Sequence, residues 1–121
     1  MAAGGGALLL PQRIPRAIAM EMLLTGDPID AERAAEVGLI NRLVDEGQAM
    51  DIAVELATRI AANGPLALIA TKEIAAGGGD WDGAEKWAKA NALMALVFDS
   101  QDAQEGARAF AEKRPPVWKG R

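Results

Sequence analysis

The chain has 121 residues and a net charge of −4, and it contains no His, Cys or Tyr. Half of its residues are apolar, but few of them are aromatic. This composition excludes Ser-His-Asp and Cys-His nucleophiles, His/Cys zinc sites, disulfides and redox CxxC motifs. Acid–base chemistry would therefore fall to carboxylates, lysines or backbone amides. The acidic balance argues against a nucleic-acid partner, and the lack of a long apolar segment or signal peptide predicts a cytoplasmic protein with no membrane partner.

The first third of the chain predicts short helices and one strand. Gly4–Gly6 opens an apolar run that Pro11 ends; its amides could face an anion or a water, or the run could be a flexible start. Two helices follow, over residues 16–24 and, capped by Asp30, over 31–37. Residues 39–44 (LINRLV) are rich in β-branched side chains and are the only plausible strand.

The middle of the chain predicts three amphipathic helices, over residues 48–62, 66–76 and 81–98, the last one capped by Asp80. One side of the third helix carries a stripe that is interpreted as ordinary core, with an interface as the alternative: Ala84, Trp87, Ala88, Asn91, Met94, Ala95 and Phe98. A single strand cannot form a sheet, so the predicted fold class is mainly α.

The last segment, residues 100–121, predicts a helix capped by Ser100 and stopped by Pro115-Pro116, with a small apolar face around Phe110. From Arg108 onward it holds five cations, opposed by Glu112 alone. Two interpretations stay open. The cations form a site for an anion such as a phosphate, or they only complement the helix C-terminus and keep the tail soluble.

Three segments, taken in order, resemble the C-terminal half of the enoyl-CoA hydratase/isomerase (crotonase) superfamily. They are AMEMLLTGDPIDAERAAEVGLINRLVDEG (19–47), NGPLALIATKEI (63–74) and FDSQDAQEGARAFAEKRPPVWKGR (98–121). The last segment is similar to the family pattern DxxEGxxAFxEKRxPxFxG, with Trp118 in place of the final Phe. The resemblance implies the helical C-terminal part of an α/β spiral fold. It also implies that the oxyanion loops and the two catalytic glutamates lie before Met1, so no residue of this chain is predicted to be catalytic.

The same resemblance implies a few substrate contacts. Lys113 matches a lysine that reaches a CoA phosphate or the adenine, often in a neighbouring subunit. Phe98, or Met94 one turn earlier, matches the side chain beside the adenine. The backbone amides of Ala2 and Ala3 match a glycine-rich turn that positions the catalytic water.

The resemblance also implies an organisation and an activity. Residues 1–63 would end the crotonase core, and residues 64–121 would form a helical oligomerisation region in a trimer or hexamer. The whole protein would act on 2-enoyl-CoA thioesters in fatty-acid metabolism, without a cofactor because CoA belongs to the substrate. The alternative is a non-catalytic helical module that oligomerises or contacts CoA.

Overall fold

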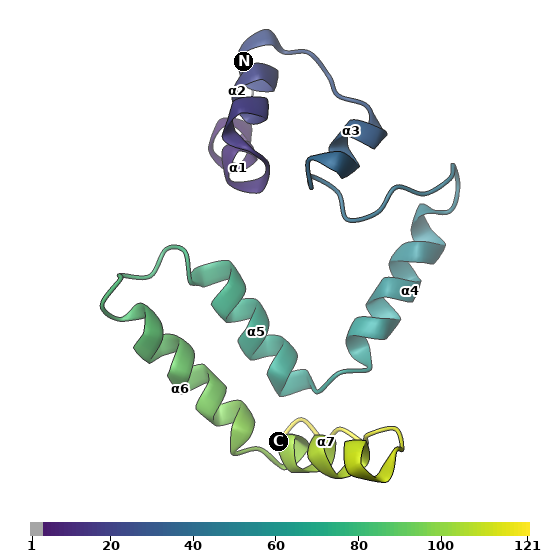
Figure 1. The fold of residues 1–121 in the computed structure, drawn as a ribbon, viewed down its shortest axis with the longest axis vertical. Coiled ribbons are helices and arrows are strands. Elements are labelled where there is room, and N and C mark those ends of the chain that lie inside the picture. The colour runs from purple at the N-terminus through teal and green to yellow at the C-terminus, as the bar shows by residue number, and fades with distance from the viewer. Residues whose placement is uncertain (1–3) are drawn as a thin grey trace. The chain divides into compact units, whose positions relative to one another are not determined.

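The computed structural model describes residues 4–121, and these residues form seven α-helices (Figure 1). The chain divides into two compact units, one ending at Ile52 and one spanning Ala53–Arg121. In chain order the helices are α1 (Gly6–Arg13), α2 (Arg16–Thr25), α3 (Ala31–Glu36), α4 (Ala49–Ala61), α5 (Pro65–Gly77), α6 (Lys86–Phe98) and α7 (Gln101–Glu112). The predicted mainly α fold class is confirmed for the residues described.

The predicted strand at 39–44 is wrong. Gly38, with φ of 78°, reverses the chain after α3, and the N–H groups of Leu39 and Ile40 both donate to the carbonyl oxygen of Ala34. The start of the predicted strand therefore completes the C-terminus of α3, as in a Schellman motif. A strand also needs a neighbour to pair with, and none of the residues from 4 onward supplies one.

Two helix boundaries differ from the prediction. Pro11 lies inside α1 instead of ending the apolar run, although proline cannot donate the hydrogen bond to the residue four positions earlier. α6 begins at Lys86 instead of Trp81, and Asp80 caps no helix. Asp82 instead builds a turn, in which its side chain accepts the N–H of Ala84 and its carbonyl oxygen accepts that of Lys86.

Helices α5 and α6 lie side by side as an antiparallel pair in the second unit (Figure 1). Between them is a small apolar groove of about 120 Å³, lined by Leu66, Ile69, Ala70, Leu93, Leu96 and Val97. The stripe that was interpreted as core faces elsewhere, since Trp87 is 72% exposed and Phe98 is 68% exposed. The core interpretation is therefore wrong within this chain. These side chains form an apolar surface that nothing in the second unit covers.

Burial is shallow throughout the described residues. The buried apolar side chains are Ile14 and four alanines, and no large side chain is fully buried. Within residues 4–121 no single helix is long and apolar enough to cross a membrane; α4 and α5 pass that test only as a pair, bent by 109°. The side-chain hydrogen bonds between residues far apart in the sequence lie around α7, where the candidate site is.

Candidate functional site

Helix α7 begins as the sequence predicts. The hydroxyl of Ser100 accepts the N–H of Ala103 at 3.0 Å, and Ser100 is buried. The face that α7 turns inward is different from the predicted one. Asp102 and Ala109 are buried, whereas Phe110 is 89% exposed. The inner face is thus made of small and acidic residues, and it holds the segment 114–121, called the tail below.

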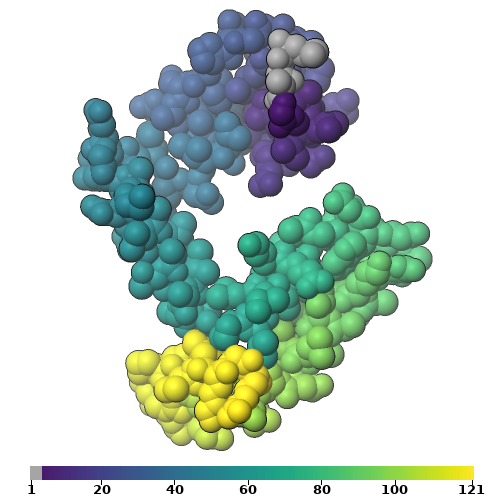
Figure 2. Space-filling model, turned by 180° about the vertical axis from the view of Figure 1, so that it is seen from behind, coloured from purple at the N-terminus to yellow at the C-terminus, as the bar shows by residue number. Residues whose placement is uncertain are grey.

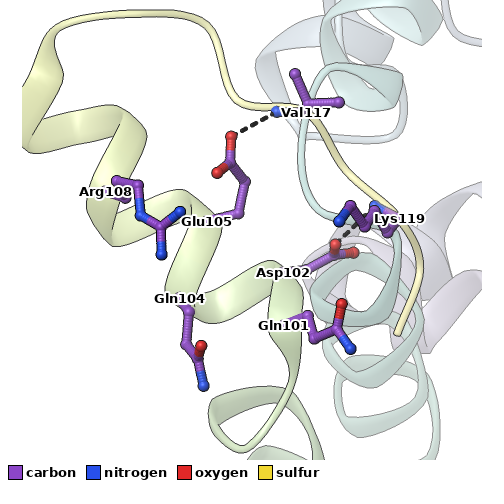
Figure 3. A pocket seen from close by; sticks show the side chains of 7 residues that line it. All are labelled: Gln101, Asp102, Gln104, Glu105, Arg108, Val117 and Lys119. Atoms are coloured by element: carbon purple, nitrogen blue, oxygen red, sulfur yellow. Dashed lines mark hydrogen bonds between the residues drawn. The ribbon is translucent and has the colours of Figure 1, made fainter.

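Asp102 binds the end of the tail through its carboxylate. Its Oδ1 accepts the N–H of Lys119 at 2.7 Å (Figure 3), and its Oδ2 accepts the N–H of Gly120 at 2.9 Å. The Asp102 N–H in turn donates to the carbonyl oxygen of Arg121. Asp102 is only 4% exposed and its carboxylate binds two amides, so it anchors the end of the chain.

Glu105, one turn later on α7, binds the beginning of the tail. Its carboxylate forms a bidentate pair with the Arg114 guanidinium, at 2.6 and 3.1 Å, and Oε1 also accepts the Val117 N–H at 2.9 Å. The Arg114 Nε donates to Glu112 at 2.6 Å. Hydrogen bonds from Arg114 and the Val117 N–H lower the pKa of Glu105 from its usual 4.5 to about 2, and the two carboxylates raise the pKa of Arg114.

Trp118 connects the tail to the turn between α4 and α5. Its indole N–H donates to the carbonyl oxygen of Ala62 at 2.8 Å. The ring lies against two glycines: a β-carbon would stand 3.2 Å from the ring at Gly106 and 3.7 Å at Gly64. A β-carbon at Gly106 would crowd the ring, which would have to move by a few tenths of an ångström. Figure 2 shows α7 and the tail together as one yellow lobe.

Lys113 lies where α7 ends and the tail begins. Its φ of 54° makes it the one non-glycine residue with positive φ among the residues described. The N–H of Lys113 donates to Phe110 and that of Arg114 donates to Ala109, which is the Schellman pattern. A side chain in this conformation costs roughly 1–2 kcal/mol, and such residues often occur at functional sites.

The five cations of the C-terminal segment do not form one cluster. Arg114 forms ion pairs with Glu105 and Glu112. Arg108 and Lys119 line an open groove of about 400 Å³ between α7 and the tail, together with Asp102 and Glu105 (Figure 3). Lys113, exposed at the end of α7, stands apart from that groove. The five cations therefore do not build one anion site, and the anion contact expected at Lys113 stays a prediction.

The other predicted contact residues lie on α6. Met94 and Phe98 share one face of that helix because they are four residues apart, and both are exposed. Phe98 ends α6 close to the start of α7, whereas Lys113 follows the last residue of α7, about 18 Å along a helix of this length. Within one chain, the length of α7 therefore separates Lys113 from Phe98. Ala2 and Ala3 lie outside the described residues.

Within residues 4–121, no group of three or more acidic residues is arranged to hold a metal ion. The two acidic residues that converge, Asp102 and Glu105, are already bound to the amides and Arg114 of the tail. Their geometry holds a chain segment and leaves no free pair of carboxylates at that place for acid–base work.

The family model for enoyl-CoA hydratase/isomerase matches residues 1–121, the whole chain. The chain belongs to this family. An enoyl-CoA hydratase from Mycobacterium tuberculosis H37Rv has a crystal structure that matches 98% of this chain at a TM-score of 0.93 and 52% identity. A probable enoyl-CoA hydratase/isomerase from Mycobacterium abscessus matches 100% of it at 0.90 and 55%. A carnitinyl-CoA dehydratase of Citrobacter koseri is 46% identical over 97% of this chain.

The chain spans about half the length of these relatives: 47% and 48% of the two crystal structures and 46% of the dehydratase. The resemblance to the helical C-terminal half of the family is therefore confirmed. The structure also gives the family's last motif a physical meaning. The D and E of DxxEGxxAFxEKRxPxFxG hold the tail, its G gives room to the aromatic ring, and its R returns to the E. Sequence reasoning missed this role of Asp102, Glu105 and Gly106, although their spacing from the tail was visible.

Proposed function

We propose that this chain is the C-terminal portion of an enzyme that acts on 2-enoyl-CoA thioesters, and that it contributes CoA contacts and subunit contacts to that enzyme. The observation that carries the proposal is the family match over the whole chain together with the coverage of only half of each relative. The reaction would be hydration or isomerisation. Because one relative is a carnitinyl-CoA dehydratase, a related reaction on a CoA thioester is the alternative within the family.

The proposed CoA contact is Lys113. An exposed ammonium can pair with a phosphate, and the pairing is charge-assisted but screened by salt. Lys113 has no acidic partner within ion-pair distance in the described chain, whereas Arg114 beside it has two. Met94 and Phe98 are proposed to flank the adenine, in a site to which another subunit contributes, because α7 separates them from Lys113.

The proposed assembly is a homo-oligomer, a trimer or hexamer. Support comes from the exposed apolar side chains of α6, including Trp87 and Phe98, since contiguous apolar patches of this kind mark interaction surfaces. Sedimentation of the purified chain tests this part. Oligomers or aggregates are expected, and a well-folded monomer at high concentration would contradict it.

The acid–base chemistry is proposed to come from residues outside this chain. The purified 121-residue chain should then show no turnover of crotonyl-CoA above background. Turnover that is free of host hydratase and lost on mutating a glutamate of this chain would overturn the proposal.

The proposed enzyme needs no resident cofactor and is located in the cytoplasm. The competing function, a non-catalytic helical module that oligomerises or contacts CoA, shares the surface contacts and lacks the catalytic partner residues.

A further inference from the structure

Three helices of the described chain end in a residue with a left-handed backbone conformation. In two of them this residue is glycine, and in the third it is lysine. α2 ends at Gly26 with φ of 77° and α3 is followed by Gly38 with φ of 78°. α7 ends at Lys113 with φ of 54°. Glycine adopts this conformation without steric cost, whereas a lysine needs surrounding contacts that hold it there.

Besides the two backbone hydrogen bonds of the Schellman pattern, those contacts come from Glu105. Arg114 directly follows the strained residue, and its guanidinium reaches back nine positions to the Glu105 carboxylate, where two hydrogen bonds of 2.6 and 3.1 Å hold it. The same carboxylate accepts the N–H of Val117, three residues further along the tail. Because both bonds require the chain to reverse at residue 113, they favour the left-handed conformation over a continuation of α7.

The reversal also decides how the Lys113 side chain leaves the helix. In a right-handed conformation residue 113 would add to α7, and its Cα–Cβ bond would follow the helical pattern of the preceding residues. In the left-handed conformation the backbone turns away, so the Cα–Cβ bond of Lys113 leaves the chain at the corner between α7 and the tail. Glu105 is well placed to act in this way, since its side chain is only 19% exposed whereas that of Glu112, the other partner of Arg114, is 52% exposed.

We propose that Glu105 is a positioning residue for Lys113: through Arg114 and the Val117 amide it holds the left-handed turn that presents the lysine to an anionic group of CoA. This proposal rests on the proposed function for its ligand. The turn itself is a property of the chain and can be measured without any ligand.

The test uses the full 121-residue chain and five variants: Glu105→Gln, Lys113→Ala, the double variant, the milder Arg114→Lys, and Glu85→Gln as control. Arg114→Lys keeps the charge and loses the bidentate fork, so it serves if Glu105→Gln folds poorly. Glu85→Gln removes an equally charged carboxylate from an exposed pair with Lys89, far along the sequence from the tail. NMR couplings report the φ of residue 113, and hydrogen exchange reports the amides of Arg114 and Val117.

In Glu105→Gln and Arg114→Lys the positive φ should be lost in part of the population and both amides should exchange faster, while Glu85→Gln should match the wild type. CoA binding, titrated at two salt concentrations, should weaken roughly fivefold in Lys113→Ala. Glu105→Gln should approach the same loss and the same reduced salt dependence. The double variant should be no worse than Lys113→Ala, because Glu105 acts through the lysine.

The outcomes separate the two proposals. If Lys113→Ala leaves CoA binding and its salt dependence unchanged, the CoA contact of the proposed function is wrong. If Lys113→Ala weakens binding but Glu105→Gln and Arg114→Lys do not, the positioning role is wrong and the contact stands. Losses that simply add in the double variant would likewise overturn the positioning role, since they would indicate independent effects.

Discussion

Replacing Asp102 by Ala should release the end of the tail and destabilise the second unit. The substitution removes two hydrogen bonds from backbone amides to a buried carboxylate, those of Lys119 and Gly120. Hydrogen bonds to charged groups contribute about 1.5–3 kcal/mol each, so the pair is worth at most roughly 6 kcal/mol. Lys119 and Gly120 are themselves exposed, so water can replace the carboxylate once the tail separates. We therefore expect the lower end of that range, about 3 kcal/mol.

The matched control is Asp51→Ala. Asp51 also stands in the first turn of a helix, α4, and is exposed. Its loss should cost only the helix-dipole interaction, about 0.3–1 kcal/mol. The assay is thermal unfolding followed by circular dichroism, with hydrogen exchange of the Lys119 and Gly120 amides. Equal changes in Tm for the two variants, with no faster exchange in Asp102→Ala, would refute the assignment of Asp102 as the anchor of the tail.

Three further predictions concern the same region. The pKa of Glu105 is lower in the folded chain, about 2 against 4.5, so its contribution to stability is present above pH 4.5 and lost as pH falls toward 2; acid titration of unfolding should show a smaller loss in this window for Glu105→Gln than for the wild type. Trp118→Phe should lower the free energy of unfolding by about 1 kcal/mol because the hydrogen bond to Ala62 is lost, and denaturant titration measures it; no change would mean that the bond contributes nothing. Lys113→Gly should raise the free energy of unfolding by roughly 1 kcal/mol by relieving the left-handed side chain, while weakening CoA binding; a destabilised Lys113→Gly would contradict the strain.

The helices could be predicted from the sequence because their signals are local. Ser100 and Asp30 cap α7 and α3 as expected, since a cap depends on neighbours within three residues. The strand at 39–44 failed because a strand is defined by a partner, and composition alone does not say whether one is present. The predicted start of α6 was wrong because Asp82-Gly83 favours a turn, and this turn replaces the first part of the helix that Asp80 could have capped.

The candidate site was harder to predict because it depends on the chain folding back on itself. Asp102 and Glu105 have an obvious local interpretation as acidic residues in the first turns of a helix, and that interpretation hides their contacts 9 to 18 residues away. The spacing groups Phe110 with alanines on one small apolar face, yet Phe110 is 89% exposed and the buried residues of α7 are Asp102 and Ala109. The left-handed Lys113 also could not be anticipated, since the sequence offers no glycine there and the contacts that hold the turn are tertiary.

A chimaera tests the claim that this chain is the C-terminal portion of an enzyme acting on enoyl-CoA thioesters. The chain replaces the matching C-terminal half of the Mycobacterium tuberculosis enoyl-CoA hydratase, to which it is 52% identical. Turnover of crotonyl-CoA is then measured beside the intact M. tuberculosis protein and the isolated chain. We expect turnover by the chimaera, diminished by Lys113→Ala, and none by the isolated chain. A folded chimaera that neither binds CoA nor turns over the thioester, beside an active intact protein, would contradict the claim.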